Sequence, residues 1–75
     1  MQVFCERLKT ARIAKKMTQT EMANTIGMKL RGYQSYESGE REPNLEKLAH
    51  ICTLLDVSAD YLLGLVGKSD DPTRH

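Results

Sequence analysis

Two short helical segments separated by one glycine constrain this chain more than any other feature. Thr18 can accept a hydrogen bond from an unpaired backbone N–H of the first turn, and Glu21 completes a T-x-x-E capping box. Met17 and Met22 have the spacing of a hydrophobic staple across this helix start. Gly27 can adopt the positive φ that ends a helix. The first segment is therefore predicted to be a short helix between Thr18 and Gly27.

The second segment is predicted to be a helix over residues 29–38 that ends at Gly39. Helical spacing places Tyr33, Tyr36 and Glu37 on its buried side. The opposite side is expected to face solvent, and it carries Leu30, Arg31, Gln34 and Ser35. Two helices joined by a short glycine turn form a helix-turn-helix, whose second helix enters the major groove of DNA. The stretch 18–39 is therefore predicted to be a DNA-binding motif.

Three further helices are predicted around this motif. The first covers residues 3–16 and has its apolar side at Phe4, Leu8 and Ala11, with Ile13 as a further candidate. Asn44 caps another helix, whose inner face is predicted at Leu45, Leu48, Ala49, Ile51, Cys52 and Leu55. Ser58 caps a last helix that leads to Gly64. No segment alternates as a strand does, so the chain is predicted to be all-α, a compact five-helix bundle.

From Phe4 to Gly64 the sequence resembles the lambda-repressor and Cro-like helix-turn-helix domains, also called the xenobiotic-response-element family. The matching segments are FCERLKTAR (4–12), MTQTEMA (17–23), IGM (26–28), YESGEREPNLEKL (36–48) and LLDVSADYLLG (54–64). They cover most of the chain in the family's order and spacing. The resemblance implies that residues 1–67 form such a domain, followed by a polar tail at 68–75. It also implies sequence-specific binding of double-stranded DNA by a transcriptional regulator of the repressor type.

The predicted second helix supplies the candidate base-reading residues. Arg31 is exposed near the helix start, where its guanidinium could meet guanine O6 and N7, and a solvated surface arginine is the alternative. Leu30 stands where the family often carries a long polar base reader, so it could touch a thymine methyl group or lie over the sugar edge. Ser35 matches the family's base-facing position one turn after Arg31. Gln34 lies more to the side, and it could reach either bases or phosphates.

Phosphate contacts are expected around the same helix. Gln19 resembles the family's phosphate-contacting glutamine, and the backbone N–H groups at its helix start add attraction for an anion. The other candidates flank the second helix, and each could instead be a solvated surface residue: Lys29, Ser38 and Arg41. The resemblance also implies a structural ion pair between Arg12 and Glu37.

The length of the chain places it among small single-domain proteins. Its 75 residues carry a net charge of +1, so a DNA-binding face must come from local placement of charge. No apolar run approaches the ~20 residues that span a bilayer, and the N-terminus does not read as a signal peptide. We therefore expect a cytoplasmic protein with no membrane partner.

Catalytic and metal-binding functions are disfavoured. No nucleophile is paired with a base and an orienting group, and a domain this small has little room for a ligand pocket. Cys5 and Cys52 form no C-x-x-C pair, so we expect reduced packing residues and not zinc ligands. No enzyme activity, cofactor or small-molecule ligand is therefore expected.

A symmetric homodimer on an inverted-repeat operator is expected, because one recognition helix covers only a few base pairs. Its surface is predicted on the apolar residues of the last helix and its extension, where family members commonly pair: Tyr61, Leu62, Leu63, Leu65 and Val66. The alternative function is a protein-interaction module, such as an antitoxin, that keeps the DNA-binding helix. An antitoxin would need a toxin-neutralising segment after Gly67, where the sequence has only a short polar stretch.

Overall fold

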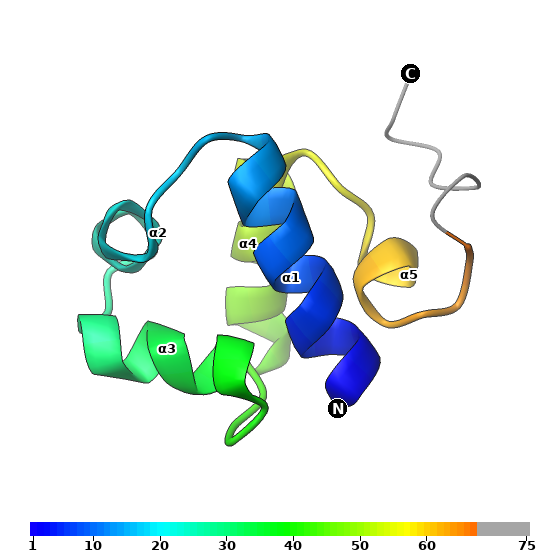
Figure 1. Ribbon diagram of the computed structural model, residues 1–75, viewed down its shortest axis with the longest axis horizontal. Coiled ribbons are helices and arrows are strands. Elements are labelled where there is room, and N and C mark those ends of the chain that lie inside the picture. Colours follow the sequence, from blue (N-terminus) through cyan, green and yellow to red (C-terminus); the bar gives the residue numbers. More distant parts are fainter. Residues whose placement is uncertain (68–75) are drawn as a thin grey trace.

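The computed structural model describes residues 1–67, which form five α-helices joined by short connections (Figure 1). In chain order these are α1 (Gln2–Ala14), α2 (Gln19–Thr25), α3 (Leu30–Ser38), α4 (Leu45–Leu55) and α5 (Ala59–Leu62). None of the described residues forms a strand, and the predicted all-α, five-helix architecture is confirmed. The predicted polar tail at 68–75 lies outside the described residues.

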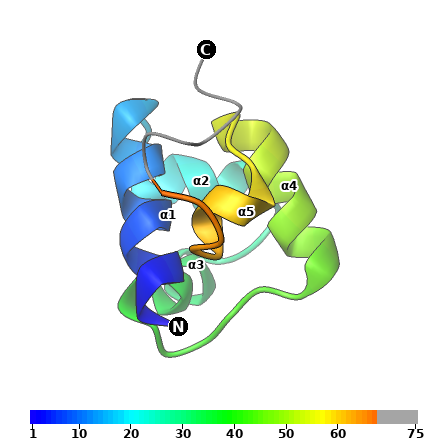
Figure 2. The ribbon, with the colours of Figure 1, turned by 90° about the vertical axis from the view of Figure 1, so that its right-hand side faces the viewer.

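The helices are arranged around α1. Figure 1 shows α2 and α3 on one side of α1 and α5 on the other, with α4 behind α1. Turning the molecule places α5 between α1 and α4 (Figure 2), and α5 packs against both. The α3 helix packs against α2 and α1. The helix pair α2–α3 therefore lies on the flank of the domain that faces away from α5.

The core receives side chains from all five helices. Its largest fully buried members are Leu8, Met22, Tyr33, Ile51, Leu55 and Leu62. The two from α4 are four residues apart and therefore lie on one face of that helix. Removal of these apolar side chains from water is the dominant favourable contribution to folding.

Side-chain caps determine where the later helices begin. The Oδ1 atom of Asn44 accepts a hydrogen bond from the Lys47 N–H at 2.8 Å at the start of α4. The Oγ atom of Ser58 accepts one from the Tyr61 N–H at 3.0 Å at the start of α5. Both predicted caps are confirmed. The α3 helix has Lys29 at its N-cap position, with no side-chain cap.

Helical periodicity misassigned three residues to the core. Ile13 is 55% exposed, Leu45 is 84% exposed, and Ala49 is also exposed. Periodicity identifies the face on which a residue lies, but it does not say whether another helix covers that face. The α1 helix also ends earlier than predicted, at Ala14, and Lys16 has a φ of 58°.

The state of the two cysteines and the presence of metal-ligating groups can be described for residues 1–67. Cys5 and Cys52 are thiols, and both are half-buried. No group of three or more metal-ligating side chains (His, Cys, Asp or Glu) is assembled within residues 1–67. Within residues 1–67, no helix has both the length and the apolar character needed to cross a membrane.

Candidate nucleic-acid interface

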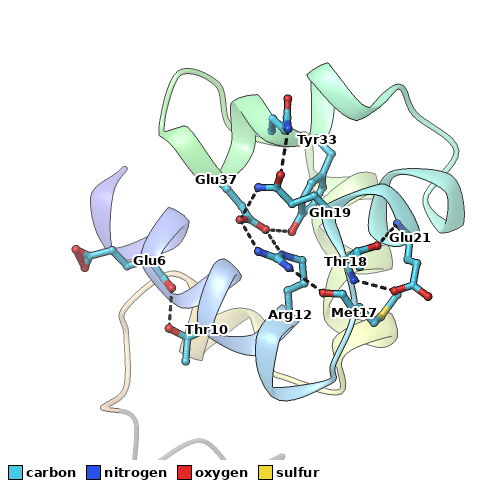
Figure 3. A network of polar contacts seen from close by, with 10 residues as sticks. Glu6, Thr10, Arg12, Met17, Thr18, Gln19, Glu21, Tyr33 and Glu37 are labelled. Carbon is cyan, nitrogen blue, oxygen red and sulfur yellow. Dashed lines mark hydrogen bonds and ion pairs between the residues drawn. The ribbon is translucent and has the colours of Figure 1, made fainter.

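The turn between α2 and α3 is built from a capping box and a glycine. At the start of α2, the Glu21 N–H donates to Thr18 Oγ1 at 3.0 Å, and the Thr18 N–H donates to Glu21 Oε1 at 2.8 Å (Figure 3). Gly27 has a φ of 73°. Directly after it, the Met28 N–H donates to the Ala23 carbonyl at 2.9 Å. The predicted capping box and glycine turn are therefore confirmed.

A lysine from α4 closes the end of α2. Lys47 Nζ donates to the Ile26 carbonyl at 2.9 Å, where the last carbonyls of a helix lack partners within the helix. Its positive charge also complements the negative end of the helix dipole. Lys47 could not be identified from the sequence, because 21 residues separate these partners and only packing brings them together.

An ion pair between α1 and α3 fastens the motif to the rest of the domain (Figure 3). Arg12 Nε donates to Glu37 Oε2 at 2.6 Å, and Arg12 Nη2 donates to Glu37 Oε1 at 3.2 Å. The remaining guanidinium nitrogen, Nη1, donates to the Met17 carbonyl just before α2, at 2.8 Å. The side chains of Arg12 and Glu37 are only 11% and 5% exposed. The predicted structural ion pair is present, and it joins α1 and α3 to the start of α2.

Each oxygen of the Glu37 carboxylate accepts hydrogen bonds from two donors, one of which is Arg12. Gln19 Nε2 donates to Oε1 at 3.1 Å, and the Tyr33 hydroxyl donates to Oε2. Burial raises the pKa of Glu37, but hydrogen bonds from Arg12, Tyr33 and Gln19 outweigh this effect and lower the pKa below its ordinary value. The hydrogen bond to Glu37 raises the pKa of Arg12, and burial raises the pKa of Tyr33. At neutral pH the group is therefore a carboxylate, a guanidinium and a protonated phenol.

Two glutamine side chains carry this network to the surface of α3. Besides its bond to Glu37, Gln19 accepts a hydrogen bond at its Oε1 atom from Gln34 Nε2, at 3.1 Å. Gln19 is half-buried, whereas Gln34 is exposed. A continuous chain of hydrogen bonds thus connects the buried ion pair to a residue expected to contact DNA.

Most of the predicted contact residues lie exposed along α3 and beside its ends. They are Lys29, Leu30, Arg31, Gln34, Ser38 and Arg41. Leu30, Gln34 and Ser38 are four residues apart and form one stripe, with Arg31 next to it. Within residues 1–67 the charged groups of Lys29, Arg31 and Arg41 have no hydrogen-bond or ion-pair partner. Their positive charges are therefore available to an external anion.

Ser35 is the exception among the predicted base readers. It is only 7% exposed, and its hydroxyl donates to the Gly32 carbonyl. The chain after Gly39 folds back over it, because the Arg41 N–H donates to the Ser35 carbonyl at 3.1 Å. The prediction that Ser35 faces outward is wrong. It rested on helical spacing within α3, which carries no information about the connection that covers Ser35.

The predicted dimer surface is also partly buried within the domain. Tyr61 and Leu62 are 3% and 0% exposed and belong to the core, so their assignment to a dimer surface is wrong. Their burial follows from the position of α5 between α1 and α4 (Figure 2). Leu65 is 70% exposed, whereas Leu63 and Val66 are half-buried. The apolar surface that remains in this region therefore centres on Leu65.

Arg7 of α1 holds α5 and its extension in place. Its Nη1 atom donates to the Tyr61 carbonyl at 2.7 Å and to the Val66 carbonyl at 2.6 Å. The guanidinium carbon also lies 4.8 Å from the centroid of the Tyr61 ring, a cation–π contact. Arg7 was not predicted to have this role. Arg7 follows Phe4 by three residues and so lies on the apolar side of α1, and this position could have indicated a structural role.

An open hollow lies where α1, α2 and α3 meet, beside the exposed stripe of α3. Its volume is about 280 Å³, and it is lined by Lys9, Gln19, Gln34, Glu37 and Ser38. Lys9 was not selected from the sequence as a contact residue. It precedes Arg12 by three positions and so lies on the same side of α1, which is the signal that could have identified it.

A family profile described as Helix-turn-helix matches residues 8–62, from the middle of α1 to the end of α5. The chain belongs to this helix-turn-helix family. Its resemblance to lambda-repressor and Cro-like domains is thereby confirmed, and the profile spans the whole α2–turn–α3 unit of this helix-turn-helix protein.

Curated relatives carry names that agree with this family. The uncharacterized HTH-type transcriptional regulator YobD of Bacillus subtilis (strain 168) is 41% identical over 70 residues, which are 93% of this chain and 60% of YobD. The uncharacterized HTH-type transcriptional regulator YqaE of the same organism is 48% identical over 61 residues, 81% of this chain and 53% of YqaE. The cryptic phage CTXphi transcriptional repressor RstR of Vibrio cholerae is 46% identical over 59 residues, 79% of this chain and 53% of RstR.

This helix-turn-helix protein thus spans between about half and three-fifths of the length of these relatives. No solved structure gave a significant match to the chain.

Proposed function

We propose that this helix-turn-helix protein is a transcriptional repressor that binds double-stranded DNA sequence-specifically, with α3 in the major groove. The observation that carries the proposal is the exposed stripe of α3 on a helix that the Arg12–Glu37 pair fastens to α1. Base reading requires side chains held in a fixed position, and a helix anchored by a buried ion pair supplies this. The relatives named as transcriptional regulators, one of them a phage repressor, support regulation as the role.

Within this function the contact residues form two groups. Arg31 reads a guanine through its planar guanidinium, and Leu30 contacts a thymine methyl group. The residues around them bind the DNA backbone, which sets the register of the helix on the duplex: Gln19, Lys29 and Arg41. The Ser38 hydroxyl already donates to the Ser35 carbonyl at 3.2 Å, so the predicted phosphate contact of Ser38 is not part of this proposal. Since the charges of Lys29 and Arg41 are unpaired within residues 1–67, they are free to neutralise phosphates.

The protein acts as a homodimer on an inverted-repeat operator in the cytoplasm. Two copies related by a two-fold axis double the contacts that one short recognition helix makes. The dimer surface in this proposal is reduced to Leu65 and its half-buried neighbours Leu63 and Val66. The half-sites are then about one helical turn apart, ~34 Å.

Selection of bound sites from a pool of random duplexes tests the proposal with the purified protein. We expect enrichment of an inverted repeat with two short half-sites. A pool that remains random after repeated rounds would remove sequence-specific DNA binding from the proposal. A reporter promoter that contains the selected site then tests the sign of regulation: expression should fall when the protein is supplied, and a rise would identify an activator.

A further inference from the structure

The hollow between α1, α2 and α3 has the character of an anion site. Of its lining residues, Lys9 is exposed, and its ammonium group has no hydrogen-bond or ion-pair partner within residues 1–67. The Ser38 hydroxyl donates to the Ser35 carbonyl at 3.2 Å, so Ser38 forms a wall of the hollow and is not a spare donor. The remaining polar groups that line the hollow are the carboxylate of Glu37 and the two glutamine amides.

Glu37 determines how both amides are oriented. An ionised carboxylate accepts hydrogen bonds and cannot donate them, so Gln19 must turn its NH₂ group toward Glu37, 3.1 Å away. Gln19 then offers its carbonyl oxygen to Gln34, which must turn its own NH₂ group inward, again at 3.1 Å. Each NH₂ group has two N–H bonds, and this chain of interactions uses one of them. Gln19 and Gln34 therefore each retain one N–H that can bind an anion.

The negative charge in the hollow does not oppose an anion there. The carboxylate of Glu37 is compensated by Arg12 at 2.6 Å, and its side chain is only 5% exposed. The uncompensated charge at the mouth of the hollow is the ammonium group of Lys9. Because the hollow borders the exposed stripe of α3, a duplex that receives α3 in its major groove carries its backbone past this point.

We infer that this hollow binds one backbone phosphate of the DNA, through Lys9 and the remaining N–H groups of Gln19 and Gln34. The inference rests on the proposed function and deepens it. It assigns a binding role to Lys9, and of the two contacts predicted as possible for Gln34, bases or phosphates, it selects the phosphate. Glu37 is then a positioning residue, because it orients the amides without contacting DNA.

Charge removal at Lys9 tests the site on a duplex selected by the wild-type protein. Lys9→Ala should weaken binding to selected and random duplexes by the same factor, about tenfold. The slope of log affinity against log salt concentration should shrink by ~0.9, the value for one phosphate contact. The site can be located with a set of duplexes, each with one phosphate replaced by a neutral methylphosphonate. The wild-type protein should bind one of these duplexes more weakly than the unmodified duplex. Lys9→Ala should bind that duplex and the unmodified one equally well.

Lys15→Ala is the matched control, since it removes the same charge beside a different hollow, next to the end of α1. Lys15→Ala should remain sensitive to the methylphosphonate that Lys9→Ala no longer detects. Gln34→Ala should weaken all sequences equally and leave the preferred bases unchanged.

The inference would be overturned if Lys9→Ala had the same slope of log affinity against log salt concentration as the wild type. It would also be overturned if Gln34→Ala had a relaxed preference at one base pair. Either result leaves the proposed function standing, provided that the wild-type protein enriches a site. A wild-type protein that enriches no site would remove both.

Discussion

Arg12 Nε lies 2.6 Å from Glu37 Oε2, although 25 residues separate the two in the chain. This contact joins the N-terminal helix to the end of the candidate recognition helix, and the same guanidinium also binds the Met17 carbonyl before α2. Three helices therefore meet at one buried charge pair (Figure 3). The hydrogen bonds of Gln19 and Gln34 continue from this pair to the surface, so stability and DNA contact depend on the same group.

Removal of one partner of this pair should destabilise the domain strongly. Arg12→Ala should lower the free energy of unfolding by ~3–5 kcal/mol, because it leaves the Glu37 carboxylate buried without its counter-charge. Urea unfolding measures the change. Lys15→Ala, an exposed substitution beside the end of the same helix, should stay within ~0.5 kcal/mol of the wild type. An unchanged midpoint for Arg12→Ala would contradict this role.

The stability of the domain should fall in acid through Glu37. Its pKa in the folded state lies below the ordinary value of 4.5, so the unfolded chain takes up the proton first as the pH falls. The contribution of Glu37 is complete above the unfolded pKa and is lost as the pH falls through the folded pKa. The difference in unfolding free energy between wild type and Glu37→Gln should therefore shrink below about pH 4.5. Unfolding curves across this range measure it, and a constant difference would contradict the assignment.

Base reading should depend on Arg31, and backbone binding on Arg41. Arg31→Ala should cost ~1–3 kcal/mol on the selected site and relax the preference at one base pair. Arg41→Ala should weaken all duplexes about equally and reduce the salt slope by ~1. Titrations of selected and random duplexes at several salt concentrations distinguish the two. Equal losses on both duplexes for Arg31→Ala would reassign Arg31 to the backbone.

Dimer formation on DNA should depend on Leu65. Leu65→Lys places a charge on a side chain that is 70% exposed, so it should leave the fold intact while it weakens pairing of two copies. Footprints should shrink from two half-sites to one at protein concentrations that saturate the wild-type site. Leu45→Lys is the matched control, because Leu45 is 84% exposed on α4 and is not one of the predicted dimer residues, and its footprint should stay complete. Two-site footprints for both variants would place the dimer contact elsewhere.

The attachment of α5 should depend on Arg7. Arg7→Met retains an apolar stem but loses the donors to the Tyr61 and Val66 carbonyls, and it should cost ~1–3 kcal/mol of stability. Hydrogen exchange should accelerate more at the backbone amides of α5 than at those of α3. Arg31→Met provides the comparison, because the Arg31 side chain has no partner within residues 1–67. Equal exchange rates in both variants would show that Arg7 does not hold α5.

The helix-turn-helix itself could be predicted from the sequence, because its signals act over a few residues. Thr18 and Glu21 cap each other within one turn, and Gly27 adopts its positive φ within the same short stretch. The caps at Asn44 and Ser58 are equally local. The Arg12–Glu37 pair is different, since its partners are distant in the chain and it was expected from the family resemblance alone.

Only the tertiary structure decided which surfaces are accessible. Ser35 is buried because the connection after α3 folds over it, and Leu62 is buried because α5 fits between α1 and α4. The hollow that contains Lys9 exists because three helices meet there, and the direction of the Gln34 amide depends on a carboxylate reached through Gln19. A periodic pattern assigns a side chain to one face of its own helix. Whether that face meets solvent, another helix or a charged partner depends on segments distant in the chain, and their positions follow from packing of the whole core.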